Sequence, residues 1–160
     1  MTWFLPEIPA SAGALLFDDR ERLLILKTTY KPGWTIPGGV MEADGETPWE
    51  ACRREVLEET GLTVTRGRLV AVDSRPAKPG RKLGLRFLFD CGIVTPDQAA
   101  TIRLQAMEIS EHRFAPRDEA LDLLRKAVSR RVEAVWPASG PRDAQNCVYL
   151  ESGRRVDGVD

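Results

Sequence analysis

The segment that most constrains this chain is ETPWEACRREVLEETG, residues 46–61, because it carries a full set of helix signals. Thr47 followed by Glu50 matches a capping box, and Pro48 falls at the first helical position, where its missing N–H costs nothing. Gly61 stands where a left-handed C-terminal cap belongs. These signals predict a helix at about residues 48–60. The apolar residues expected to face the core recur at helical spacing: Trp49, Cys52 and Val56.

The same helix places three carboxylates, Glu55, Glu58 and Glu59, on one face. Like charges at this spacing cost a few tenths of a kcal/mol, and the last turn of a helix disfavours anions. One interpretation is an ordinary solvated face, in which Arg54 pairs with Glu58. The other is a hard divalent cation, because a donor set of oxygen atoms suits Mg²⁺ or Mn²⁺ rather than Zn²⁺.

The residues just upstream, PGGVMEADGE, favour the cation. Gly38 and Gly39 allow the backbone to come close to a ligand, and a carbonyl there is a candidate metal ligand. A glycine pair alone indicates only a turn. Directly before a capped acidic helix, it predicts the edge of a binding pocket.

The rest of the chain alternates strands with one further helix, and this order predicts an α/β sandwich built on a mixed sheet. Apolar runs at 12–17 and 23–29, separated by a polar turn, are expected to be strands. The other expected elements are strands at 62–74, 83–94 and 108–116, a single amphipathic helix over 117–136, and a hairpin over 146–156.

Composition excludes several classes of function. Lys plus Arg (23) nearly equals Asp plus Glu (24), so no overall field favours long nucleic acids or an anionic membrane. No apolar run approaches the roughly 20 residues of a membrane helix. The three cysteines are widely spaced and there is a single histidine, which argues against a disulfide framework and a His-rich zinc site. We therefore expect a cytoplasmic protein.

Residues 39–62 resemble the signature of the Nudix hydrolases, G-x5-E-x7-R-E-U-x-E-E-x-G-U, where U is aliphatic. The positions that match at the family spacing are Glu46, Arg54, Glu55, Val56, Glu58, Glu59, Gly61 and Leu62. One departure occurs, because six residues rather than five separate Gly39 from Glu46. We expect the surface turn before Glu46 to absorb the extra residue.

The resemblance implies a Nudix-type α/β/α sandwich as a single domain over 1–160, with a core at about 10–135 and a C-terminal extension over 136–160. It also implies Mg²⁺-dependent hydrolysis of a nucleoside diphosphate linked to another group: a nucleoside triphosphate, a nucleotide sugar or ADP-ribose, or a dinucleoside polyphosphate. Glu55, Glu58 and Glu59 would bind Mg²⁺, with Mn²⁺ as a substitute and the Gly39 carbonyl as an extra ligand. Glu55 is our choice of general base. Arg54 and Glu46 would pair and orient the carboxylates.

A carboxylate outside the motif often contributes in this family, and Glu111 is our first candidate, ahead of Glu108. The alternative is that Glu111 is an exposed strand residue. His112 is expected to be structural. A catalytically inactive Nudix module that only binds nucleotides, and an isomerase on the same fold, are the alternative functions.

Several residues are weaker candidates for binding the small-molecule substrate. Lys31, Arg81, Lys82 and Arg86 are candidates to contact its phosphates, or are surface charges. Trp34 and Phe87 either stack on a base or line the core. Trp3 and Phe4 cover the sheet edge or a dimer partner, which leaves a homodimer open.

Overall fold

The computed structural model describes residues 3–137 and 146–159, and a nine-stranded sheet runs through this part of the chain. Neighbouring strands follow the order β3-β2-β1-β6-β5-β8-β9, with β4 beside β1 and β7 beside β2. The strands are β1 (Ala10–Phe17), β2 (Leu23–Thr28), β3 (Trp34–Thr35), β4 (Gly38–Val40), β5 (Arg68–Arg75), β6 (Gly84–Ile93), β7 (Ile109–Ala115), β8 (Val148–Glu151) and β9 (Arg154–Arg155). The helices are α1 (Pro48–Thr60), α2 (Pro96–Ala99), α3 (Arg117–Leu123) and α4 (Lys126–Val135).

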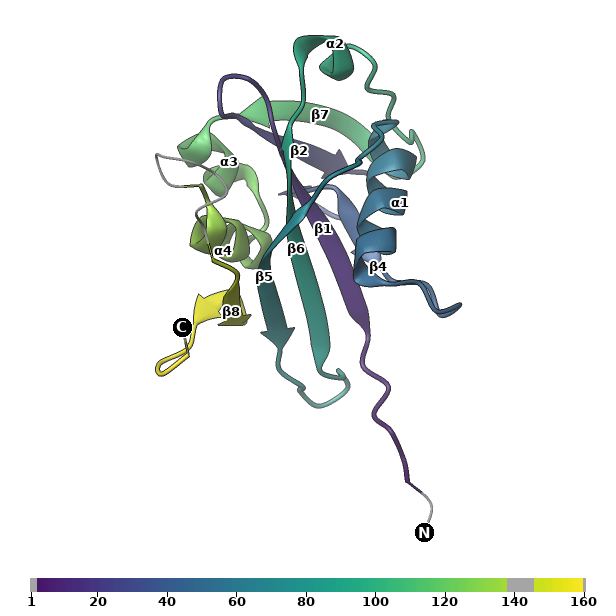
Figure 1. Cartoon of the computed structure of the whole chain (residues 1–160), viewed down its shortest axis with the longest axis vertical. Helices are drawn as coiled ribbons and strands as arrows, with labels where there is room; N and C mark the ends of the chain where they lie inside the picture. Colours follow the sequence, from purple (N-terminus) through teal and green to yellow (C-terminus); the bar gives the residue numbers. More distant parts are fainter. Residues whose placement is uncertain (1–2, 138–145, 160) are drawn as a thin grey trace.

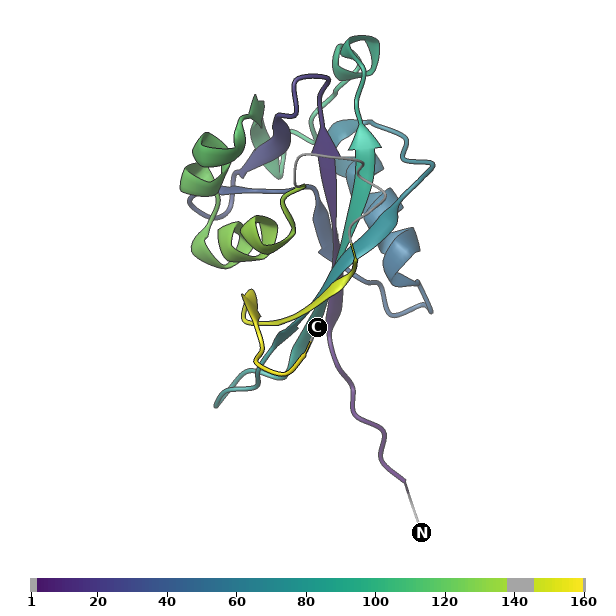
Figure 2. The ribbon, with the colours of Figure 1, turned by 60° about the vertical axis from the view of Figure 1, so that its left-hand side comes forward.

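Helices cover both faces of this sheet. Helix α1 lies on one face, and α3 and α4 lie on the other (Figures 1 and 2). Each face has its own apolar core: Leu24 and Leu26 of β2 point to the α1 side, whereas Leu23 and Ile25 point to the α3–α4 side. Two strand pairs, β1–β6 and β5–β8, are parallel and the others are antiparallel. The predicted α/β/α sandwich with a mixed sheet is therefore confirmed.

Strand β1 positions the glycine pair beneath α1. Its first half pairs with β4, so that Ala12 lies opposite Gly39 and Gly13 opposite Gly38. A Cβ at Gly38 would meet the Ala12 carbonyl oxygen at 2.4 Å, and the φ of Gly38 is +155°. Only glycine fits this close backbone approach. The glycine pair is thereby fixed in the sheet directly beside the acidic helix.

The prediction of a single helix over 117–136 is wrong. The structure has α3 and α4 instead, separated at Leu124, whose backbone is extended (φ −63°, ψ 144°). The next N–H, that of Arg125, donates to the Trp34 carbonyl at 3.0 Å, and the Arg125 Nε donates to the Pro32 carbonyl at 2.9 Å. This long-range anchoring breaks the helix, although the apolar spacing continues through it.

The strand expected at 62–74 begins later, at Arg68. Gly67 lies against the ring of Trp49, where a Cβ would come within 2.3 Å of a ring carbon. Residues 62–67 therefore cross the surface of α1 before they reach the sheet. This docking determines where β5 starts.

The C-terminal hairpin is confirmed as β8 and β9, joined through Ser152 (φ 53°) and Gly153 (φ 74°). Two consecutive positive φ values are typical of a tight hairpin turn. Strand β8 pairs in parallel with β5, so the described part of 136–160 extends the central sheet.

At the other end of the chain, the side chains of Trp3 and Phe4 are 83% and 90% exposed, and the homodimer stays a prediction. Among the described residues, no helix is both long and apolar enough to cross a membrane.

Candidate metal and active site

Helix α1 forms where the sequence predicts it and presents the three glutamates as expected. The Thr47 hydroxyl accepts from the Glu50 N–H at 3.2 Å, and the Glu50 carboxylate accepts from the Thr47 N–H at 2.8 Å. Gly61 ends the helix in the left-handed conformation (φ 75°). Cys52 and Val56 are fully buried and Trp49 is partly buried, as predicted. Glu59 is buried on the same side, whereas Glu55 is partly buried and Glu58 is exposed.

Arg54 is the hub of the carboxylate cluster. Its Nε and Nη2 donate to the two oxygens of Glu46 at 2.7 and 2.9 Å, which is a bidentate ion pair. Its Nη1 donates to Glu55 at 2.9 Å and to Glu58 at 3.2 Å. The pairing with Arg54 lowers the pKa of Glu46 to about 2. One guanidinium thus fixes the orientation of three carboxylates.

Glu59 is the buried member of the cluster, with an exposed fraction of 6%. One of its carboxylate oxygens accepts from the Gly38 N–H at 3.1 Å. Burial, reinforced by the charges of Glu55, Glu108 and Glu58, raises the pKa of Glu59 to about 8. Among the described residues no cation is paired with this carboxylate.

Glu55 lies against the glycine pair. A Cβ at Gly39 would be 2.3 Å from the nearer Glu55 oxygen, so the carboxylate occupies the space that a larger residue would fill. Burial raises the pKa of Glu55 despite its hydrogen bond with Arg54. Glu58 is the exposed member of the three.

A fourth carboxylate joins the cluster, and it is Glu108. Its charge raises the pKa of both Glu55 and Glu59. The loop before β7 docks on the end of α1, because the N–H of Arg103 donates to Thr60 and that of Gln105 donates to Glu59, at 2.8 and 3.3 Å. No local sequence pattern predicts that this loop packs against the end of α1.

Glu111, our first candidate for the extra carboxylate, lies elsewhere. It is opposite Lys27 in the sheet and 3.6 Å from the guanidinium of Arg113. Arg113 itself lies over the ring of Trp34, which belongs to the core on the α3–α4 side. Glu111 therefore projects from the face opposite α1, whereas Glu108 lies with the motif glutamates.

The donor set fits a hard divalent cation. All the candidate ligands are oxygen atoms, and Mg²⁺ commonly binds through one or two carboxylates while it keeps several waters. In the described part of the chain, the buried carboxylate of Glu59 has a single backbone donor and lies among three other glutamates. Among the described residues, no three acidic, thiol or imidazole side chains already surround one point. Glu55 and Glu58 are held by Arg54 instead.

The other predicted substrate contacts are dispersed. Lys31 is exposed in the loop before β3, and Trp34 is 7% exposed within the core. Phe87 packs on the α1 side, and the His112 ring meets that of Phe114 edge-on at 6.5 Å.

The two remaining candidates, Arg81 and Arg86, lie together on the face opposite α1. The glycine pair in β4 and Arg86 in β6 are on either side of β1.

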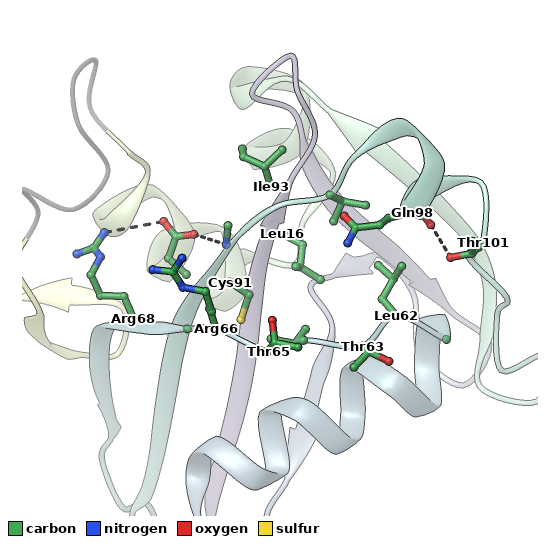
Figure 3. Close-up of a pocket in the computed structure, with 16 residues that line it drawn as sticks. Leu16, Leu62, Thr63, Thr65, Arg66, Arg68, Cys91, Ile93, Gln98 and Thr101 are labelled. Carbon is green, nitrogen blue, oxygen red and sulfur yellow. Dashed lines mark hydrogen bonds and ion pairs between the residues drawn. The ribbon is translucent and has the colours of Figure 1, made fainter.

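A pocket opens beyond the C-terminal end of α1, between residues 61–68, the end of β6 and α2 (Figure 3). Arg66, Arg68 and Cys91 line it, and Asp90 accepts a hydrogen bond from the Gly92 N–H at 2.9 Å. None of the four clustered glutamates is among its lining residues. This pocket is therefore separate from the candidate metal site.

The carboxylate helix, the glycine pair beneath it and the sandwich around them lie within a segment that matches a known protein family. The NUDIX domain family matches residues 7–135, which is most of the chain. The chain belongs to the Nudix family. Its acidic helix and glycine pair are thus the Nudix motif of this chain.

Individual relatives match over shorter stretches. The chain is 43% identical over 61 residues to a MutT-like protein of Streptomyces ambofaciens, a match that covers 38% of each. It is 36% identical over 95 residues to an RNA pyrophosphohydrolase of Gluconacetobacter diazotrophicus, covering 48% of this chain and 54% of that protein. The chain thus spans about half or less of the length of these curated relatives.

The fold is also found in solved structures. The crystal structure of the MutT protein from Methanosarcina mazei Go1 superposes with a TM-score of 0.63 at 24% identity. The match covers 78% of this Nudix chain and 92% of the other. At this identity the similarity supports the shared fold.

Proposed function

We propose that this Nudix protein is a Mg²⁺-dependent hydrolase that cleaves the phosphoanhydride bond of a nucleoside diphosphate linked to another group. Membership of the family supports this, as does the similarity to a protein named as an RNA pyrophosphohydrolase. The observation that carries the proposal is the convergence of Glu55, Glu58, Glu59 and Glu108 beside Gly38 and Gly39. Arg54 bonds to only two of these four carboxylates, Glu55 and Glu58, so the cluster has an excess of negative charge that a divalent cation would balance.

The residues that would hold Mg²⁺ are Glu55, Glu58 and Glu59, with the Gly39 carbonyl. Bound there, Mg²⁺ supplies positive charge that offsets the charge of the diphosphate, and Mn²⁺ supplies the same. Arg54 fixes the directions of Glu55 and Glu58 through Nη1 and is itself fixed by Glu46. It is a positioning residue.

Glu55 is the proposed general base. Its carboxylate accepts a proton from the attacking water as the water oxygen bonds to phosphorus and the P–O anhydride bond breaks. The leaving phosphate or phosphate ester takes the bonding electrons. Glu108, rather than Glu111, is the proposed extra carboxylate, because only Glu108 acts electrostatically on Glu55 and Glu59.

The test is hydrolysis of a substrate panel with product identification. Nucleoside triphosphates, dinucleoside polyphosphates and nucleotide sugars are incubated with the protein and Mg²⁺, with and without EDTA. We expect metal-dependent turnover of at least one class. Glu58→Gln should lower it by about 100-fold or more, because a metal ligand is lost. The matched control is Glu133→Gln, an exposed glutamate on α4, which should leave turnover unchanged.

The panel also separates the alternatives. Nucleotide binding measured by calorimetry without turnover of any class would contradict the hydrolase and favour a binding module. Comparing Glu108→Gln with Glu111→Gln tests the extra carboxylate, and a larger loss in the Glu111 variant would contradict our assignment.

A further inference from the structure

Four arginines gather on the sheet face opposite the glutamates. Arg86 of β6 lies directly opposite Asp73 of β5, and the charges of Arg75, Arg81 and Arg131 act on it. Arg75 lies two residues beyond Asp73 on the same strand, Arg81 belongs to the loop before β6, and Arg131 comes from α4. Four separate elements thus bring positive charge to one place.

Asp73 is the acid whose charge acts on Arg86, and its carboxylate is already engaged. One oxygen accepts from the Nε of Arg131 at 2.7 Å, and the other accepts from the Gly153 N–H at 2.9 Å. Asp73 therefore links Arg131 of α4 to the C-terminal hairpin. Among the described residues its ion pair is with Arg131, although its charge also acts on Arg86.

The guanidinium groups of Arg75, Arg81 and Arg86 have hydrogen-bond donors that are not used within the described part of the chain. The Nε atoms of Arg75 and Arg81 are buried and have no hydrogen-bond acceptor among the described residues. Arg86 is partly buried and makes no hydrogen bond or ion pair with any residue in 3–137 or 146–159. Burial and the charges of Arg131 and Arg75 lower the pKa of Arg86. Buried donors and charges without partners are costly, and a phosphate accepts from several guanidinium groups at once.

The cluster lies close to the motif. Ser11 of β1 lies between Val40 of β4 and Arg86 of β6 in one row across the sheet. Two strand spacings separate Val40 from Arg86, which is roughly 10 Å. Val40 directly follows Gly39, and β1 is the one strand that pairs with β4 in the described sheet. A single extended ligand that passes the free side of β4 can therefore reach both sites.

We propose that Arg75, Arg81, Arg86 and Arg131 bind a phosphate monoester of the substrate that is not hydrolysed. This inference rests on the proposed function for its link to turnover. The preferred substrate would carry a phosphate monoester in addition to the diphosphate that is cleaved. The arginine cluster would then determine specificity, and the glutamates would carry out the chemistry.

Pyrophosphate binding without divalent metal tests the arginine site alone. Calorimetric titration in EDTA removes the contribution of the metal site, where the glutamates repel anions. We expect saturable binding to the unmodified protein, and at least tenfold weaker binding to Arg86→Gln. Arg117→Gln, which changes an exposed arginine on α3, is the matched control and should bind normally. Circular dichroism confirms that each variant is folded.

Absence of saturable binding, or equal affinity in the Arg86 variant, would overturn the site. An equal loss in the Arg117 variant would also overturn it, because binding would then follow overall charge. These readouts need no turnover, so they decide the arginine site even if the hydrolase proposal fails.

A kinetic comparison then tests the link to the substrate. Two hydrolysed substrates that differ only by one phosphate monoester are compared in both proteins. Arg86→Gln should raise KM at least tenfold more for the phosphorylated substrate than for its partner. Equal changes in KM would contradict recognition of the substrate, and the site would then be one for a separate anion.

Discussion

The two faces of the sheet carry opposite charge imbalances. On the α1 side, Arg54 pairs with Glu46, Glu55 and Glu58, and the buried Glu59 beside them has no paired cation among the described residues. On the α3–α4 side, four arginines gather around Asp73, which bonds to Arg131 and lies opposite Arg86. Each cluster costs free energy in the protein alone, and each is relieved by a ligand of opposite charge. A metal bound to a phosphorylated substrate supplies both charges.

The clusters also differ in how the chain builds them. Most of the acidic cluster comes from a single helix, so the spacing of its glutamates can be recognised within a few consecutive residues. The basic cluster is assembled from two strands, a loop and a helix that are far apart in sequence. The acidic cluster can be recognised in the sequence as a motif, whereas the basic cluster forms only when the sheet brings its residues together.

Among variants outside the glutamates themselves, the largest effect is expected from Gly39→Ala. The added methyl group would collide with the Glu55 carboxylate, at 2.3 Å from its nearer oxygen, and push it out of the cluster. A shift of about 1 Å in a reacting group can cost about 100-fold in rate, so we expect a loss of that size in kcat with the fold retained. Val40→Ala, a truncation at the exposed neighbouring residue, is the control. Full activity in the Gly39 variant would contradict the claim that the position of Glu55 in the cluster is needed for catalysis.

Arg54→Lys should come next. Lysine cannot make the bidentate pair with Glu46 while it also donates to Glu55 and Glu58. We expect the free energy of unfolding to fall by about 2 kcal/mol, measured by urea denaturation. Arg53→Lys removes one hydrogen bond, to the Val64 carbonyl, and should have the smaller effect. Equal losses would show that Arg54 is not the hub.

Glu59→Gln tests the charge excess through pH. The pKa of Glu59 is raised from 4.5 to about 8, so the folded state holds a proton that the unfolded state has lost between these values. The contribution of Glu59 to stability is therefore full below pH 4.5 and is lost as pH rises through about 8. The variant should flatten this decline and be more stable above pH 8, by about 1–2 kcal/mol.

Thermal unfolding across this pH range, without metal, is the measurement for Glu59. Added Mg²⁺ should restore stability most at the alkaline end, where the ligands are deprotonated. A decline of unchanged slope in the variant would assign the pH dependence to other groups.

The smallest effect is expected from Arg86→Met on the basic face. It removes a partly buried charge that lies among like charges and keeps much of the apolar stem. We expect the free energy of unfolding to rise by about 0.5 kcal/mol at low salt, and less at high salt. Arg117→Met on the exposed surface of α3 is the comparison. Destabilisation by the Arg86 variant would mean that this arginine holds the fold together.

Local signals predicted the acidic helix, because each concerns residues a few positions apart. Thr47, Pro48 and Gly61 fix its ends, and Arg54 and Glu55 fix the motif. The sandwich with a mixed sheet and the C-terminal hairpin followed from the order of the elements. These features depend little on how distant segments meet.

The remainder depends on contacts between distant segments. Glu108 reaches the cluster only because Arg103 and Gln105 bond to the end of α1. The second helix is split at Leu124 because Arg125 bonds to β3 and to the loop before it, and no glycine or proline marks the break. The arginine cluster depends on the register between β5 and β6. None of these three features gives rise to a periodic pattern in the sequence.

Mn²⁺ binding followed by electron paramagnetic resonance tests the cation site on the acidic face most directly. We expect saturable binding to the unmodified protein, competition by Mg²⁺, and a loss of about tenfold or more in Glu58→Gln. Glu133→Gln should bind as the unmodified protein does. Equal Mn²⁺ affinity in the Glu58 variant, or no saturable binding in the unmodified protein, would contradict a cation site on the acidic face.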